Sequence, residues 1–155
     1  MPKFSRILCP VDFDANSSLA LKAASELAAE RKAALFILHV IAIPPGPEVA
    51  LPFEKMETAA RTRLKRLADQ KIGRRADYEI EVMIGDPGAE ILSAARQHRA
   101  ELIVMATHGR KGLRRLMLGS VAERVVREAP CPVLTVKPKV SRSASTRSMT
   151  AKARV

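Results

Sequence analysis

The sequence predicts an α/β fold, a five-stranded parallel sheet with helices on both faces. Five short apolar runs alternate with four longer segments of helical periodicity. Strands that alternate with helices form parallel sheets through right-handed crossovers. The runs contain few polar residues, which is typical of strands covered on both faces. With 155 residues, 47% of them hydrophobic and only 3% aromatic, the chain can build one aliphatic, alanine-rich core.

The first strand is expected over residues 6–12. Proline donates no ladder hydrogen bond, so Pro10 should lie near the end of this strand, and Asp12 should project from its carboxyl end. A helix over about residues 16–31 follows, and residues 34–41 form a second apolar strand that a proline-rich loop ends. The small apolar residues of the helix share one face: Ala20, Ala23, Ala24, Leu27 and Ala28.

The middle of the chain continues the alternation. A second helix is expected over about residues 53–72. Its inward face holds Met56, Ala60, Leu64 and Leu67. Residues 78–84 alternate more than the other strands, which predicts an edge strand. Asp86 followed by Pro87 predicts the capped start of a third helix, which runs to about His98.

The last third of the chain carries a candidate phosphate site. A strand over residues 102–106 leads into a loop, a helix over about residues 120–128 and a fifth strand over residues 133–136. Ser120, with Glu123 three residues later, predicts a capping box. The loop is rich in glycine and cations: Gly109, Gly112, Gly119, Arg110, Lys111, Arg114 and Arg115. A helix start exposes N–H groups and the positive end of a dipole, so this loop is predicted to hold phosphate.

Ligands of parallel sheets bind at the carboxyl ends of strands where the strand order reverses. If the first and fourth strands flank that reversal, Asp12 and the 106–120 loop face one crevice. Asp12 would then serve ribose hydroxyls or Mg²⁺, and a helix-capping role is the alternative. His108 would contact phosphate or hydrogen-bond the backbone. The P-loop and G-x-G-x-x-G patterns are both absent.

The net charge is +11, and residues 138–155 carry five basic residues and no acid, which leaves 11 − 5 = +6 for residues 1–137. We therefore expect one domain over residues 1–137 and a basic, Ser-rich, disordered tail over residues 138–155. The charge favours anionic partners, but the scarcity of stacking aromatics argues against nucleic acid. No apolar run reaches the roughly 20 residues that span a bilayer. With no signal-peptide layout at its start, the chain is expected to be cytoplasmic and not bound to a membrane.

Cysteines and histidines show no metal-ligand spacing. Cys9 and Cys131 lie in or beside apolar strands and are interpreted as buried structural thiols, with a disulfide or a reactive thiol as the alternative. His39 is interpreted as a satisfied core histidine, and His98 as a helix C-terminal cap.

Four segments carry a resemblance to a known family: Ile7–Asp12, His39–Val40, Gly85–Pro87, and the series from His108 through Gly119-Ser120-Val121 to residues 130–136. In this order and spacing they resemble the universal stress protein family over about residues 3–137. The resemblance implies a Rossmann-like three-layer sandwich of the adenine-nucleotide alpha hydrolase type. It also implies a homodimer paired through the last strand.

One branch of that family binds ATP through the motif G-x2-G-x9-G-[ST]. Here the motif begins at Ala106, which replaces the first glycine, and Ala122 stands where the pattern often supplies a hydroxyl. The resemblance implies adenine and ribose contacts at Pro10, Val11, Asp12, Val40 and Met105. It implies phosphate contacts at Gly109, Gly119, Ser120 and Val121, and Ala106 and His108 complete the candidate set.

The function expected from these observations is a regulatory domain that binds ATP with Mg²⁺ in a stress response. No catalytic set is evident, so any ATP hydrolysis should be slow. Two alternatives stay open. The first is an interaction module of the same fold without a nucleotide, which Ala106 and Ala122 favour. The second is a polyanion binder that uses the basic loop and the tail.

Overall fold

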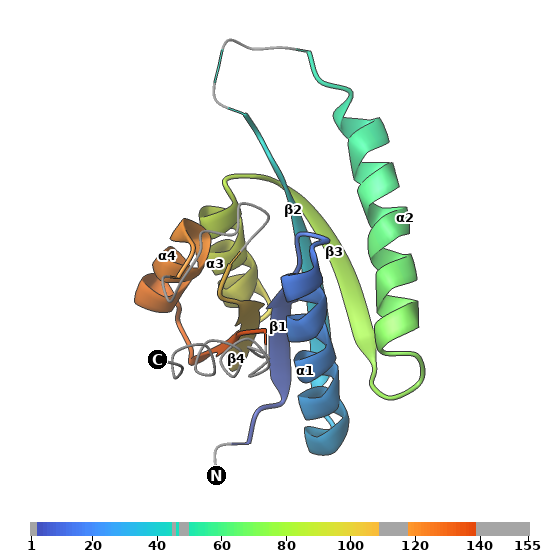
Figure 1. Ribbon diagram of the computed structural model, residues 1–155, viewed down its shortest axis with the longest axis vertical. Coiled ribbons are helices and arrows are strands. Elements are labelled where there is room, and N and C mark those ends of the chain that lie inside the picture. Colours follow the sequence, from blue (N-terminus) through green and yellow to red (C-terminus); the bar gives the residue numbers. More distant parts are fainter. Residues whose placement is uncertain (1–2, 45, 47–49, 109–117, 139–155) are drawn as a thin grey trace, which may run out of the picture.

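The computed structural model describes residues 3–44, 46, 50–108 and 118–138, and strands and helices alternate along them (Figure 1). The elements are β1 (Arg6–Pro10), α1 (Ala15–Arg31), β2 (Ala34–Ala42), α2 (Phe53–Lys71), β3 (Tyr78–Gly85), α3 (Pro87–Gln97), β4 (Leu102–Ala106), α4 (Ser120–Glu128) and β5 (Val133–Val136). All strand pairs are parallel. The predicted fold class and the predicted order of elements are therefore confirmed.

The strand order is β3-β2-β1-β4-β5, with β1 in the centre. The chain winds outward from β1 through β2 to β3 and then returns to the other side of β1, where Ile7 pairs with Leu102. The order thus reverses between β1 and β4, as expected for a ligand crevice. β3 occupies one edge of the sheet, which confirms its predicted edge position, and β5 occupies the other.

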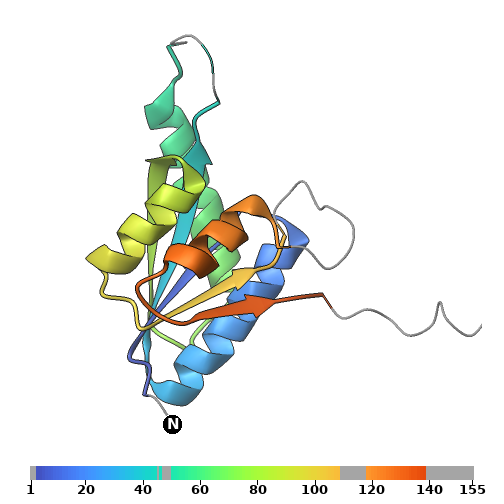
Figure 2. The same cartoon turned by 90° about the vertical axis from the view of Figure 1, so that its left-hand side faces the viewer.

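The sheet is the middle of three layers. Figure 2 shows α3 and α4 in front of the sheet and α1 and α2 behind it. Alternation along β1 divides the core between these faces: Ile7 and Cys9 pack with α1 and α2, whereas Leu8 packs with α3 and α4. Each fully buried aliphatic side chain of this kind contributes about 1.5–3 kcal/mol to stability.

The buried face of α1 is rotated from the predicted alanine stripe. Its buried residues are Ser17, Ala20, Leu21, Ala24, Ser25 and Ala28, whereas Ala23 and Leu27 are only partly buried. The helix packs on both β1 and β4. Its buried face therefore includes two serines that the apolar periodicity does not mark. Ser25 is tolerated there because its hydroxyl donates to the Lys22 carbonyl at 2.8 Å.

Helix α2 is less deeply buried than α1. Only Leu64 and Ala68 are fully covered, and Met56, Ala60 and Leu67 pack at the margin of the core. The helix rests on β2 and β3 near the sheet edge, and its outer face stays polar. The helix is therefore amphipathic, as predicted.

Two predictions about sulfur and histidine can be compared directly with the structure. Both cysteines are free thiols, and Cys9 is buried as interpreted, whereas Cys131 is only partly buried. Burial raises the pKa of each thiol. His98 occupies the C-cap position of α3, but its side chain does not cap that helix: Nε2 lies 2.7 Å from Oε2 of Glu81 on β3, and the ring stacks on Phe36.

In the described part of the chain, no helix is long and apolar enough to cross a membrane.

Candidate functional site

A crevice of about 750 Å³ opens at the carboxyl edge of the sheet. It lies where β1 and β4 diverge, so it coincides with the reversal of strand order. Its walls come from the ends of β1, β2 and β4 and from the first turns of α3 and α4. A volume of this size is typical of small-molecule sites.

The structure brings together ten of the eleven candidate residues from the sequence. Those that line the crevice are Pro10, Val11, Asp12, Val40, Met105, Ala106, His108, Gly119, Ser120 and Val121. The eleventh, Gly109, lies outside the described residues, as do the loop cations at 110, 111, 114 and 115 and the tail from residue 139. The expectation that Asp12 and Ser120 face one crevice is met.

Sequence reasoning missed several other lining residues: Ser17, Leu38, His39, Ile41, Ala42, Pro87, Ile91 and Thr107. The sequence could have indicated Thr107 and Ser17, because they are polar residues that follow β4 and β1 within a few positions. It could not have indicated Ile91, since an apolar residue on the inner face of a helix looks like core. Its exposure to the crevice depends on where α3 begins relative to β2.

The turn after β1 is built by two aspartates and a serine. The Asp14 carboxylate accepts the Ser17 N–H at 2.7 Å and so caps α1. The Asp12 carboxylate accepts the Asp14 N–H at 3.2 Å, and the Asp12 N–H donates to the Ser17 hydroxyl. The helix cap is therefore Asp14, and the alternative capping role for Asp12 is wrong. Partial burial, with the neighbouring Asp12 charge as a smaller cause, raises the pKa of Asp14.

The start of α4 differs from the predicted capping box. Gly119, and not Ser120, is the N-cap residue, and no side chain caps the helix. The first intrahelical bond runs from the Glu123 N–H to the Gly119 carbonyl at 2.8 Å. The N–H groups of Ser120, Val121 and Ala122 thus begin the helix without a side-chain acceptor. All three of these residues line the crevice, so the positive end of the helix faces it.

A backbone hydrogen bond closes the base of the loop between β4 and α4. The Gly119 N–H donates to the Thr107 carbonyl at 2.8 Å, and the Thr107 N–H donates to the Val136 carbonyl at 3.2 Å. Thr107 is 1% exposed. The two ends of the loop are therefore fixed to the sheet and to the helix start.

His108 makes a contact that neither sequence interpretation included. Its Nδ1 lies 2.9 Å from the Thr107 hydroxyl, a side-chain partner and not the backbone. Its Nε2 is buried and has no hydrogen-bond partner in the described part of the chain. A buried nitrogen without a partner costs about 1–3 kcal/mol, so a polar ligand group at this position would recover free energy.

His39 is satisfied, as interpreted, and it also lines the crevice. Its Nδ1 lies 2.8 Å from the Val11 carbonyl oxygen, which can only accept, so Nδ1 carries the proton. The ring also packs against Phe13 with centroids 4.3 Å apart. Phe13 has a positive φ of 66°, a conformation uncommon for a bulky residue. The His39 ring therefore joins the end of β2 to the turn after β1.

Ala106 does not strain the backbone. It is the last residue of β4, it pairs with Val136, and it is absent from the described residues with positive φ. The replacement of glycine by alanine at this position is therefore compatible with the backbone. Its methyl group still occupies space on the crevice wall.

β2 extends past β1 at the crevice. The β1–β2 pairing ends at Pro10 with Leu38, and residues 39–42 continue in register with β3 only. Val40 lies two residues beyond Leu38, whose carbonyl accepts the Val11 N–H on the β1 side. The directions of backbone groups alternate along a strand, so those of Val40 point to the same side as those of Leu38. Among the described residues, no strand pairs with Val40 on that side.

Comparison with known proteins gives consistent results. A family model described as the universal stress protein family matches residues 3–137. Universal stress protein MJ0531 of Methanocaldococcus jannaschii is 36% identical over 142 residues, which cover 86% of this chain and 82% of that protein.

Solved structures agree on the fold. The universal stress protein UspA from Lactobacillus plantarum superposes with a TM-score of 0.79 at 26% identity, covering 88% of this chain and all of that one. A universal stress protein from Archaeoglobus fulgidus, in complex with dAMP, superposes with a TM-score of 0.63 at 21% identity over 88% of this chain and all of that one.

Proposed function

The chain belongs to the universal stress protein family, and on that premise we propose that its crevice binds an adenine nucleotide. The nucleotide we propose is ATP with Mg²⁺, and its binding would serve a regulatory role in a cytoplasmic stress response. The observation that carries the proposal is the meeting of Asp12 with the uncapped start of α4 across one crevice of about 750 Å³.

The apolar part of the crevice suits the adenine ring. Met105 and Val11 are buried in its wall, and Ile41 extends it from β2. The backbone groups of Val40 beyond the end of β1 offer a donor and an acceptor to the edge of the base. Such a site combines apolar area with a few placed polar groups, as small-molecule pockets do.

The polar part of the crevice suits ribose and phosphate. The Asp12 carboxylate is an acceptor for ribose hydroxyls. The N–H groups at Ser120 and Val121 stand at the positive end of α4, where anions bind favourably. The Ser120 side chain is exposed and adds a hydroxyl. The buried Nε2 of His108 provides one more position at which a ligand group would gain a hydrogen bond.

Mg²⁺ fits this site only together with the nucleotide. No group of three potential ligand side chains occurs in the described ranges, and Asp12 would be the sole carboxylate that we assign to the ion. Mg²⁺ commonly binds one or two carboxylates together with ligand phosphates and water. The ion would therefore be held by Asp12 and the phosphates, and its role would be to neutralise their charge.

The dAMP complex from Archaeoglobus fulgidus supports the ligand class. That protein has the same fold, and the ligand named for it is an adenine nucleotide. The present crevice supplies independent physical reasons for the same class here.

We also propose a homodimer through β5. This strand forms an edge of the sheet, and its Leu134 side chain is 42% exposed. An edge strand presents unpaired backbone groups that a second copy can satisfy.

The alternative function is an interaction module of this fold without a nucleotide. Ala122 favours it, because a methyl group stands at the first turn of α4 where a hydroxyl would add a phosphate contact. The two functions differ in one measurement, which is whether the folded protein binds ATP below about millimolar concentration.

Isothermal titration of the full-length protein with ATP and Mg²⁺ tests the proposal. Asp12→Asn and Gly119→Val should each weaken binding at least about tenfold, a loss of roughly 1.4 kcal/mol. Gly119 has φ −60° and ψ 158°, which any residue adopts, so the larger side chain tests close approach of the ligand. Asp77→Asn, at an exposed residue before β3, is the matched control and should bind like the wild type.

Mass spectrometry of the denatured, freshly purified protein gives a second measurement, and co-purified adenine nucleotide is the expected result. Failure of the well-folded wild type to bind ATP up to millimolar concentration would overturn the proposal and favour the interaction module. Undiminished binding by both crevice variants would place the ligand elsewhere.

A further inference from the structure

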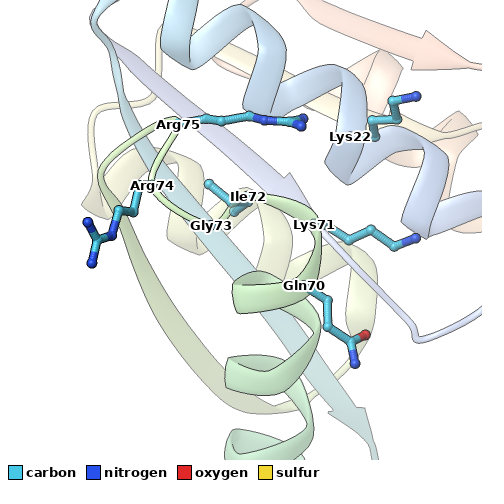
Figure 3. Close-up of a pocket in the computed structure, with 7 residues that line it drawn as sticks. All are labelled: Lys22, Gln70, Lys71, Ile72, Gly73, Arg74 and Arg75. Atoms are coloured by element: carbon cyan, nitrogen blue, oxygen red, sulfur yellow. The ribbon is translucent and has the colours of Figure 1, made fainter.

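A second hollow of about 560 Å³ lies at the end of α2 (Figure 3). It is formed by the turn that leads from α2 toward β3, together with Lys22 on α1. This turn precedes the first residue of β3, so it lies at the amino edge of the sheet, opposite the carboxyl-edge crevice. The two sites share no residue.

The lining of the hollow is cationic. Four of its seven residues are basic: Lys22, Lys71, Arg74 and Arg75. The others are Gln70, Ile72 and Gly73, so no carboxylate lines it. Like charges gathered on a small surface repel one another unless an anion lies between them.

Ion pairs do not relieve this repulsion. Within the described ranges, none of the four cations has a carboxylate partner within 4 Å. The acid nearest along α2, Asp69, is bound to Lys65 at 2.6 Å and to the Tyr78 hydroxyl. The hydrogen bond from Lys65 lowers the pKa of Asp69. The Asp69 carboxylate is thus paired with Lys65 and does not neutralise the cations of the hollow.

The cationic side chains border the hollow from several directions and do not converge on one point (Figure 3). Figure 3 shows Arg75 and Lys71 extending toward α1, which carries Lys22, whereas Arg74 points to the other side of the turn. The four cations that border the hollow thus come from α1, from the end of α2 and from the turn. Arginine presents a fork that matches phosphate, and lysine acts as a mobile point charge.

Three backbone N–H groups of the turn are already hydrogen-bonded within the protein, so an anion in the hollow would be bound by side chains. The N–H groups of Ile72, Gly73 and Arg75 all donate to carbonyls of α2 and its C-terminal turn. These bonds keep the turn in place, and Gly73 adopts a positive φ of 56° that completes it. Ile72 is buried in the core and anchors the turn from below.

We propose that this hollow is a second anion site that takes a chain of two or more phosphates. Several separated cations require several negative charges on one ligand, which a polyphosphate chain supplies and a single carboxylate does not. The lining has no aromatic residue and one aliphatic residue, so it offers little apolar surface to a base. Inorganic tripolyphosphate and the phosphate chain of ATP should therefore bind here alike, and AMP should bind much more weakly.

Amide NMR spectra of the full-length protein test the proposal. Tripolyphosphate, added at constant ionic strength near 0.15 M, should shift the Gly73 amide and its neighbours in a saturable way. Lys71→Gln/Arg75→Gln should weaken this binding by about tenfold or more. Lys55→Gln/Arg66→Gln removes the same charge from exposed positions of α2 that line neither site, and it should leave the affinity near that of the wild type.

Each remaining outcome overturns the proposal. No shift at Gly73 with saturating tripolyphosphate would exclude the site. An equal loss in the control pair would show a diffuse response to net charge, and unchanged affinity in Lys71→Gln/Arg75→Gln would show that these cations do not bind the anion. Since Gly119→Val alters only the other edge, it should leave the Gly73 response intact even if the crevice binds no nucleotide.

Discussion

Nη1 of Arg124 on α4 lies 2.6 Å from Oδ2 of Asp86, the residue that caps α3. The same carboxylate oxygen accepts the Ala89 N–H at 2.9 Å. One side chain thus caps one helix and ties it to a second. Because both helix starts line the crevice through Pro87 and Ser120, this contact helps to set the width of the crevice.

Substitution of Asp86 and Arg124 should show coupling. Asp86→Ala should cost about 1 kcal/mol, because it removes the N-cap. Arg124→Gln should cost less, since the pair is 40% and 63% exposed and exposed ion pairs contribute about 0.2–1 kcal/mol. Urea denaturation of both single variants and the double variant measures the coupling. Arg127→Gln, on the same helix, should show none with Asp86→Ala, and zero coupling at Arg124 would contradict the contact.

Gly85→Ala should destabilise the protein by about 1–3 kcal/mol. Gly85 has a φ of +155°, and a Cβ there would lie 2.7 Å from Oε1 of Glu90. The positive φ and the contact with Glu90 both disfavour alanine, and only the contact depends on Glu90. The double variant Gly85→Ala/Glu90→Ala should therefore recover part of the loss in a thermal melt. A Gly85→Ala protein as stable as the wild type would show that neither the conformation nor the contact matters.

The pKa of Asp14 should fall toward its ordinary value when Asp12 is replaced. Burial raises the pKa of Asp14 most, the Ser17 N–H opposes this rise, and the Asp12 charge adds to it. Asp12→Asn removes that charge. Carbon NMR titration of the Asp14 carboxyl in both proteins measures the change, and a higher pKa in Asp12→Asn would contradict the geometry.

The raised pKa of Asp14 also predicts how its contribution to folding stability changes with pH. The folded state holds the proton to a higher pH than the unfolded chain, so this contribution is fully present below the ordinary pKa of 3.8. It is lost as the pH rises from that value through the folded-state pKa. Asp14→Asn keeps a capping side chain and should remove this component. Urea midpoints of both proteins across that pH range check the prediction.

The oligomeric state should depend on Leu134. If β5 pairs with a second copy, Leu134→Glu places a charge on the interface and shifts the protein toward monomer, as measured by light scattering after gel filtration. Leu19→Glu is the matched control, since Leu19 on α1 is also 42% exposed. Dimers that persist in Leu134→Glu, or a monomeric wild type, would refute pairing through β5.

Local patterns explain why the elements could be predicted and why their ends could not. The apolar run at 102–106 and the capped start at Asp86 each depend on neighbours in sequence, and both predictions hold. For Asp12 the sequence left a capping role open as the alternative to ligand binding, because Asp12 and Asp14 both precede α1 and cannot be told apart by pattern. Only the backbone path after β1 places Asp14 within 2.7 Å of the Ser17 N–H.

The sequence by itself determined the alternation of strands and helices, and with it the edge of the sheet at which Asp12 and Ser120 would meet. The tertiary structure decided how that edge is built: β2 continues past β1 to present Val40, and the Gly119 N–H closes onto the Thr107 carbonyl. It also decided that Lys22 joins the cations at the end of α2. The physical reason is that periodicity reports which face of an element is buried, whereas contacts between distant residues depend on how far each element extends and how the layers pack.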